Sequence, residues 1–132
     1  MKWGVVTRRG ALRVVFVAYW ITLFGLTHLP KLPAYPGPRY KDKIAHTAAY
    51  AVLAGLAVVA WRIGRGSAAR SAAVWFAVLS SYAAVDELLQ PLVGRSCTVG
   101  DWLADTVGVA LAVAVWLIGT GARRSATDLS PS

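Results

Sequence analysis

Four apolar blocks, each about as long as a lipid bilayer is thick, constrain this chain more than any other feature. They run from Ala11 to Leu29, Ile44 to Trp61, Ala72 to Gln90 and Trp102 to Thr120. A helix needs roughly 20 apolar residues to cross a hydrocarbon core of about 30 Å. Charged residues make up only 15% of the chain, well below the share typical of soluble domains. The sequence therefore predicts an all-α fold: a four-helix transmembrane bundle in one membrane domain over residues 1–122, followed by a disordered polar tail at 123–132.

Basic residues gather on one face of such a bundle. Nine of them lie in the N-terminal segment, the second connection and the C-terminal tail, whereas five lie in the first and third connections. The positive-inside rule then places both termini in the cytoplasm. The net charge of +8 does not indicate nucleic-acid binding, because the chain is built from uniformly apolar segments rather than amphipathic ones.

The second and fourth blocks are rich in small residues. Within lipid, close packing through small side chains is a main source of attraction between helices. We therefore expect tight packing through these two blocks, by residues Ala48, Ala49, Ala51, Ala54, Gly55, Ala57, Gly108, Ala110, Ala112 and Ala114.

Acidic residues cluster where the apolar blocks meet the first and third connections. Ionisable groups in or beside a membrane are costly, face the bundle interior or water, and often mark functional sites. Asp42, His46 and Tyr50 recur every four residues, so they line one stripe of the second helix. Arg95 lies between two acidic groups on the third and fourth helices. The predicted ligand-binding residues are Asp42, Lys43, His46, Tyr50, Asp86, Glu87, Gln90, Arg95, Asp101 and Asp105.

Carboxylates this close together need compensation. Two of them at ~4 Å repel each other by about 4 kcal/mol at an effective dielectric constant of 20. Arg95, Lys43 and Arg39 can supply the opposite charge, and so can a bound divalent cation or a shared proton. Arginine and lysine suit a phosphate or carboxylate headgroup, whereas Asp, Glu and His suit a hard cation or acid–base chemistry.

Three functions fit this pattern. In the first, an outward-facing pocket at headgroup level binds an anionic envelope lipid or lipid-linked precursor, which Arg95 and Lys43 hold. In the second, the protein is an enzyme that acts on a lipid-linked substrate, with Glu87 or His46 as catalytic acid or base and a divalent cation as cofactor. In the third, it is a non-catalytic scaffold, in which Arg95 pairs with Glu87 or Asp101, Asp42 and Lys43 form a network, and Asp101 caps its helix.

Two motifs in the chain resemble the VanZ-like family of small bacterial membrane proteins. The segment KDKIAHTAAYAVLAGL, from Lys41 to Leu56, matches the family's D-K-x-x-H-x-x-x-Y pattern. The segment DELLQPLVGRSCTVGDWLADTVG, from Asp86 to Gly108, matches its D-E-x-x-Q, G-R and D/N-T-x-G elements. Family members often carry a histidine before the glutamine, where this chain has Leu89, so the resemblance does not support an obligatory second histidine.

The resemblance implies a multi-pass protein of the bacterial inner (cytoplasmic) membrane. The family's founding relative is associated with low-level resistance to the glycopeptide antibiotic teicoplanin. The resemblance supplies neither a reaction nor an oligomeric state.

Overall fold

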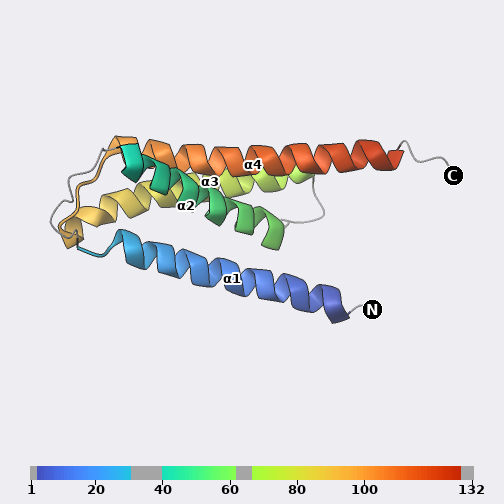
Figure 1. Cartoon of the computed structure of the whole chain (residues 1–132), viewed down its shortest axis with the longest axis horizontal. Helices are drawn as coiled ribbons and strands as arrows, with labels where there is room; N and C mark the ends of the chain where they lie inside the picture. The colour runs from blue at the N-terminus through green and yellow to red at the C-terminus, as the bar shows by residue number, and fades with distance from the viewer. Residues whose placement is uncertain (1–2, 31–39, 62–66, 129–132) are drawn as a thin grey trace.

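The computed structural model describes residues 3–30, 40–61 and 67–128, with side chains described from 8 to 121 within those ranges. Four long helices confirm the predicted all-α fold (Figure 1). They are α1 (Trp3–Thr27), α2 (Tyr40–Ala60), α3 (Ala68–Leu89) and α4 (Val99–Asp128), and a short 3₁₀ helix, η1 (Gln90–Val93), follows α3. Four stretches of 20 to 26 residues, one along each long helix and the third continuing through η1, are long and apolar enough to cross a membrane. The protein is therefore a multi-pass membrane protein.

All four helices begin before their apolar blocks, and in two of them the added turn carries a carboxylate. α2 starts at Tyr40 and α4 at Val99, so Asp42 and Asp101 lie in first turns. Carboxylates are favoured there because the first amides of a helix are free and its N-terminal end is partly positive. Hydropathy marks the apolar span, whereas backbone hydrogen bonding extends the helix into its polar flank.

The C-terminal end of α4 reaches residues that the sequence assigns to the polar tail. The helix continues to Asp128, and residues 129–132 lie outside the described part of the chain. The disorder of the tail therefore stays a prediction.

The end of α3 differs from a simple proline stop. The α-helix ends at Leu89, but the chain continues as η1 with Pro91 in its first turn. It then turns at Gly94, whose φ of 75° is a left-handed conformation that glycine adopts readily. The amide of Arg95 donates to the carbonyl of Gln90 at 3.1 Å. This turn directs Arg95 back towards the bundle.

Helices that are not consecutive in sequence form the tightest pair. Both termini lie at one end of the bundle, so α2 and α4 run in parallel (Figure 1), and they make the most extensive contact. A Cβ atom added at Gly108 would collide with the backbone of Thr47, and the Thr47 hydroxyl donates to the carbonyl of Ala104 at 3.1 Å. The predicted close packing of the two small-residue helices is confirmed at this crossing.

Helix α1 is attached through aromatic side chains. Phe16 is 2% exposed and makes edge-on ring contacts with Trp20, Trp61 and Trp75 at 5.1 to 5.7 Å between centroids. The hydroxyl of Tyr19 donates to the carbonyl of Ala49 at 3.0 Å. These contacts set the position of α1, whose last turns form one wall of the pocket described below.

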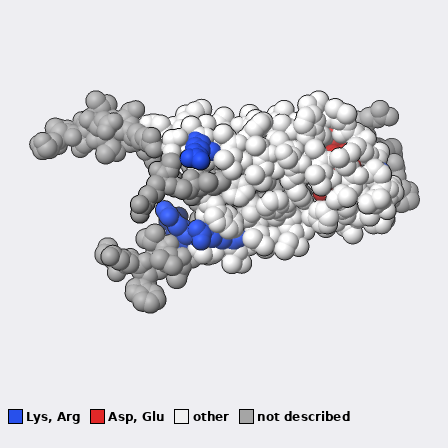
Figure 2. Space-filling view, turned by 180° about the vertical axis from the view of Figure 1, so that it is seen from behind, with Lys and Arg blue, Asp and Glu red and all other residues white. Residues whose placement is uncertain are grey.

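The two ends of the bundle differ in charge. The described arginines of α1 and α3, which are Arg8, Arg9, Arg13 and Arg70, lie towards the end that carries the termini (Figure 2). At the other end the acidic side chains show only as small patches between uncharged atoms in this view. Of the five acidic side chains that the structure describes, three are buried, namely Asp86, Glu87 and Asp105.

Candidate functional site

The predicted site residues divide into a buried layer and an outer layer. Asp86, Glu87, Gln90 and Asp105 are each at most 2% exposed. Asp42 and Lys43 are exposed, and Asp101 is half-buried. The buried layer lies in the last turns of α3 and the second turn of α4, which are packed against α2.

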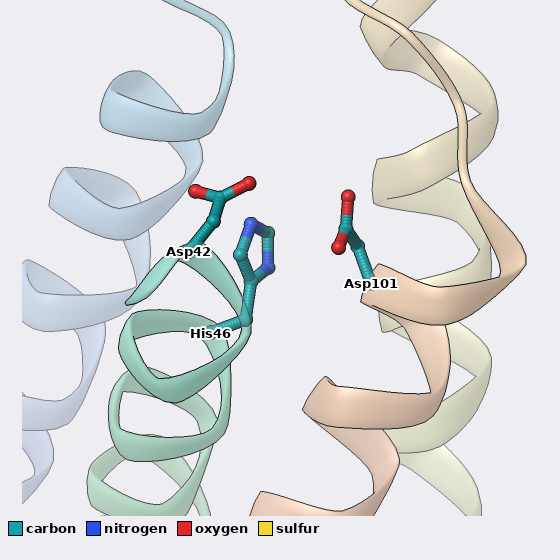
Figure 3. Close-up of side chains that lie close together, drawn as sticks. All are labelled: Asp42, His46 and Asp101. Carbon is teal, nitrogen blue, oxygen red and sulfur yellow. The ribbon is translucent and has the colours of Figure 1, made fainter. Parts of the chain in front are cut away.

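His46 connects the two layers. Its Nδ1 lies 2.9 Å from Oδ1 of Asp105, within hydrogen-bond distance. On the outer side its ring lies between the carboxylates of Asp42 and Asp101 (Figure 3). Two groups have ligand atoms within 4.8 Å of one another: an inner one of His46, Glu87 and Asp105, and an outer one of Asp42, His46 and Asp101. Nitrogen and carboxylate ligands at such distances are able to hold a metal ion.

The carboxylate of Glu87 is held by two donors. The side-chain amide of Gln90 donates to Oε1 at 2.8 Å, and the backbone amide of Thr98 donates to Oε2 at 3.0 Å. Thr98 also caps α4, because its hydroxyl accepts the amide proton of Asp101 at 3.1 Å. The expectation that Asp101 caps this helix is therefore wrong. The spacing of Thr98 and Asp101 is that of a capping box, a signal in the sequence that could have identified Thr98.

Asp86 is held by hydroxyl groups that the sequence analysis did not identify. Thr27, at the end of α1, donates to its Oδ1 at 3.1 Å, and Tyr82 donates to the same oxygen at 3.4 Å. His28 Nδ1 lies 3.6 Å from that oxygen. Tyr82 precedes Asp86 by four residues, one helical turn, and this spacing is the only sequence signal for the contact.

The basic residues do not pair as the scaffold hypothesis expects. Lys43 Nζ lies 3.2 Å from Asp101 Oδ1. The guanidinium of Arg95 donates from Nη1 to the carbonyl of Leu29 at 3.4 Å and forms no ion pair with any described residue, so its expected pairing with Glu87 or Asp101 is wrong. Its buried Nε atom has no hydrogen-bond partner among the described residues.

A cavity of about 150 Å³ lies between α1 and α2, beside Arg95. Thr27 and Arg95 line it together with the Asp42–His46–Tyr50 stripe, which confirms that these three side chains share one face of α2. The hydroxyl of Tyr50 is buried and has no partner among the described residues. The rest of the wall is apolar and consists of Leu23, Leu26, Ala45 and Ala49.

Four of the ten predicted ligand-binding residues thus line this cavity, namely Asp42, His46, Tyr50 and Arg95. The other six lie deeper or on the far side of His46. Chemically, the arrangement offers a cationic donor and hydroxyl groups beside a small cavity, next to a buried His–Asp pair that can hold a proton or a cation.

Comparison with known proteins identifies the domain. The family model VanZ/LLP1 matches residues 11–120, which include all four membrane spans except the first three residues of the first span and the last residue of the fourth. No curated protein and no solved structure matches the chain.

Proposed function

We propose that this chain, which belongs to the VanZ/LLP1 family, binds the anionic, phosphate-bearing headgroup of an envelope lipid or lipid-linked precursor. The proposed binding site is the cavity of its membrane domain. The cavity of about 150 Å³ is smaller than the roughly 300 Å³ at which pockets for drug-sized ligands begin. It suits a headgroup whose acyl chains stay in the surrounding bilayer. The leucine and alanine side chains of the wall would contact the apolar part of such a ligand.

Arg95 is the observation that carries this proposal. An arginine side chain at the edge of a membrane protein normally has an anionic partner, because its five donors are costly to leave unmet. Three nearby carboxylates are already held by other groups: Asp101 by Lys43, Asp105 by His46 and Glu87 by Gln90. Asp42 lines the same cavity but forms no ion pair with Arg95. Arg95 has a backbone carbonyl and an unmet Nε instead. A phosphate oxygen from a ligand would complete its hydrogen bonding.

The other polar residues of the cavity fit the remainder of a headgroup. Asp42 and Tyr50 line the same cavity as Arg95. Asp42 would accept a hydrogen bond from a hydroxyl or ammonium group of the headgroup, and the Tyr50 hydroxyl would donate to an oxygen. Lys43, which the sequence analysis placed on the anion, instead pairs with Asp101 and does not line the cavity.

The orientation that we propose exposes this cavity to the cell envelope. Basic residues are in excess at the end with the termini, and positive ends face the cytoplasm in multi-pass inner-membrane proteins. The cavity lies at the opposite end, at headgroup level of the outer leaflet. Such a position would allow the protein to alter access to lipid-linked precursors, which is one route to the teicoplanin resistance associated with the founding relative of the family.

The test is a titration of phosphatidylglycerol into the purified full chain in detergent, followed by native mass spectrometry, with phosphatidylcholine as the comparison lipid. A charge-assisted hydrogen bond contributes about 1.5–3 kcal/mol, so Arg95→Ala should weaken phosphatidylglycerol binding roughly 10–100-fold. Arg95→Lys should fall between Arg95→Ala and the wild type, because lysine keeps the charge but loses the planar fork.

Arg70→Ala is the matched control, since it removes an arginine from the opposite end of the bundle. Equal effects of Arg95→Ala and Arg70→Ala, or no effect of either, would refute the headgroup site. If Arg95→Ala abolishes accumulation in the membrane instead of binding, the scaffold function is supported.

A second candidate function is acid–base chemistry on the bound headgroup. The observation in its favour is that His46 lines the cavity while its Nδ1 contacts Asp105 at 2.9 Å. An aspartate in this position fixes the tautomer of an imidazole that acts as general base. Release of phosphate or of a headgroup from a lipid substrate, lost in Asp105→Asn, would establish this function. Binding without any turnover would leave the protein a lipid-binding one.

A further inference from the structure

We propose that His46, Glu87 and Asp105 bind one divalent transition-metal cation between α2, α3 and α4. Their ligand atoms lie within 4.8 Å of one another and come from three different helices. One imidazole nitrogen with two carboxylates suits Zn²⁺ or Mn²⁺, whereas Mg²⁺ and Ca²⁺ prefer oxygen ligands alone. Of the three ligands only His46 also lines the headgroup cavity. The cation site therefore does not depend on the proposed headgroup.

Burial and charge favour a cation at this place. Glu87 is 2% exposed and Asp105 0%, and Asp86 beside them is 1% exposed. Among the described residues, no lysine or arginine forms an ion pair with any of the three. Buried carboxylates without an opposite charge are strongly destabilising, above all within a membrane, and a protonated His46 can neutralise only one of the three. A divalent cation would neutralise two of them at once.

An unpartnered atom marks the position. The second carboxylate oxygen of Asp105, Oδ2, is buried and has no hydrogen-bond partner among the described residues. Buried polar atoms are nearly always satisfied, so such an oxygen calls for an explanation. A cation that Asp105 shares with His46 and Glu87 supplies one. The proton held between His46 and Asp105 would leave to solvent as the cation binds, so a bound cation and the acid–base function of this nitrogen exclude each other.

The hydrogen bonds to Glu87 resemble those that orient the carboxylate ligands of a metal ion. Gln90 and the amide of Thr98 each donate to one of its oxygens, at 2.8 and 3.0 Å, and each oxygen keeps a lone pair for a cation. Ligating carboxylates are typically oriented by such hydrogen bonds. The outer group is the weaker candidate, because its Asp101 is already paired with Lys43 and its Asp42 is exposed.

The experiment is a metal-binding titration of the purified full chain in detergent. The protein is stripped with EDTA, and ZnCl₂ and MnCl₂ are then titrated against a competing chelator, with bound metal measured by mass spectrometry. We expect about one equivalent of cation per chain. Loss of an outer-shell partner typically weakens metal affinity roughly 10–100-fold, which we expect for Gln90→Ala. Removal of a direct ligand in Glu87→Gln or Asp105→Asn should weaken it by more than about 100-fold, beyond that range.

Two variants separate this site from its neighbours. Asp101→Asn should keep the affinity, because Asp101 belongs only to the outer group. Arg95→Ala should also keep it while losing phosphatidylglycerol, so failure of the headgroup site and failure of the cation site give different results. No stoichiometric uptake of either cation by the wild type would overturn the proposal, and so would uptake that Asp101→Asn abolishes and Glu87→Gln leaves intact.

X-ray absorption of the zinc-loaded wild type tests the ligands without any variant. One nitrogen ligand with the remainder oxygen, at about 2.0–2.2 Å, is expected for this donor set. A sulfur ligand at about 2.3 Å would assign the ion to Cys97 and overturn the proposal.

Discussion

Two histidine–aspartate pairs join the first helical hairpin to the second, and they are built differently. His46 Nδ1 lies 2.9 Å from Asp105, whereas His28 Nδ1 lies 3.6 Å from Asp86. His28 instead contacts its own helix, because its Nδ1 lies 2.9 Å from the carbonyl of Phe24 and its ring stacks on the Phe24 ring. His46 is therefore held by the other hairpin, and His28 mainly by α1.

The two aspartates also differ in the number of side-chain hydrogen bonds that they accept. Asp86 accepts hydroxyl hydrogen bonds from Thr27 and Tyr82, so it stays partly satisfied without its histidine. Oδ1 of Asp105 has only His46 as a side-chain partner among the described residues. The same two residue types thus form a link between α1 and α3 that Thr27 reinforces, and a link between α2 and α4 in which the histidine is the only described side-chain partner of Asp105 Oδ1. The neighbours of a pair, and not its composition, determine which of these it becomes.

The largest expected effect comes from removing each histidine in turn. His46→Ala leaves Asp105 buried without its partner, and breaking a buried ion pair costs about 3–5 kcal/mol. His28→Ala should cost only about 1 kcal/mol, a typical single hydrogen bond, since Asp86 keeps its hydroxyl donors. The free energy of unfolding in mixed SDS and dodecylmaltoside micelles measures both changes. Equal losses would mean that the two pairs are equivalent.

A smaller effect is expected when α2 and α4 are forced apart. Gly108→Ala places a methyl group against the backbone of Thr47, which no side-chain rotation can relieve, and overpacking of this kind costs about 1–3 kcal/mol. The shift should break the His46–Asp105 contact and leave the His28–Asp86 contact in place. ¹⁵N-histidine NMR, which observes the two rings separately, together with the unfolding measurement, checks this.

Gly119→Ala is the control for this experiment, because it lies on the same helix with nothing within 4 Å of the added carbon. It should leave both histidine signals unchanged. A change at His28 that is as large as the change at His46 would contradict the separation of the two pairs.

The smallest effect on stability is expected from substitution of Cys97. This residue lies in the connection between α3 and α4, at the end of the bundle that holds both histidine–aspartate pairs. Its thiol is exposed, so a membrane-impermeant maleimide should label it in intact cells if this end faces outwards. Cys97→Ser should change stability by no more than about 0.5 kcal/mol, as is usual for surface positions. In that background, Ala69→Cys places a thiol at the opposite end and should react only after lysis. The reverse pattern would put both pairs on the cytoplasmic side.

Much of the fold follows from the sequence. The length and hydropathy of the blocks predicted four spans, and the small residues of the second and fourth blocks predicted tight packing through these helices, which Gly108 confirms where α2 and α4 meet. The four-residue spacing of Asp42, His46 and Tyr50 predicted their common face. Such features are local: they depend on helical geometry and on the thickness of a bilayer, both of which are fixed in advance.

The partners of the charged groups did not follow from the sequence. Arg95 contacts the carbonyl of Leu29 and not Glu87, and Lys43 contacts Asp101. Thr27, which had no signal in the sequence, donates to Asp86 from another hairpin. Contacts between helices depend on their rotation and relative height, and residue spacing within one helix does not specify either.

The sequence by itself therefore determined that this chain crosses the membrane four times and gathers five of its six acidic residues at one end, because hydrophobic length and helical period act along a single segment. Only the tertiary structure decided which carboxylates became buried, which of them met His46, and that Arg95 kept an unmet donor beside a cavity. Those outcomes arise where separate helices pack, since each buried polar group takes the partner that packing brings within about 3 Å.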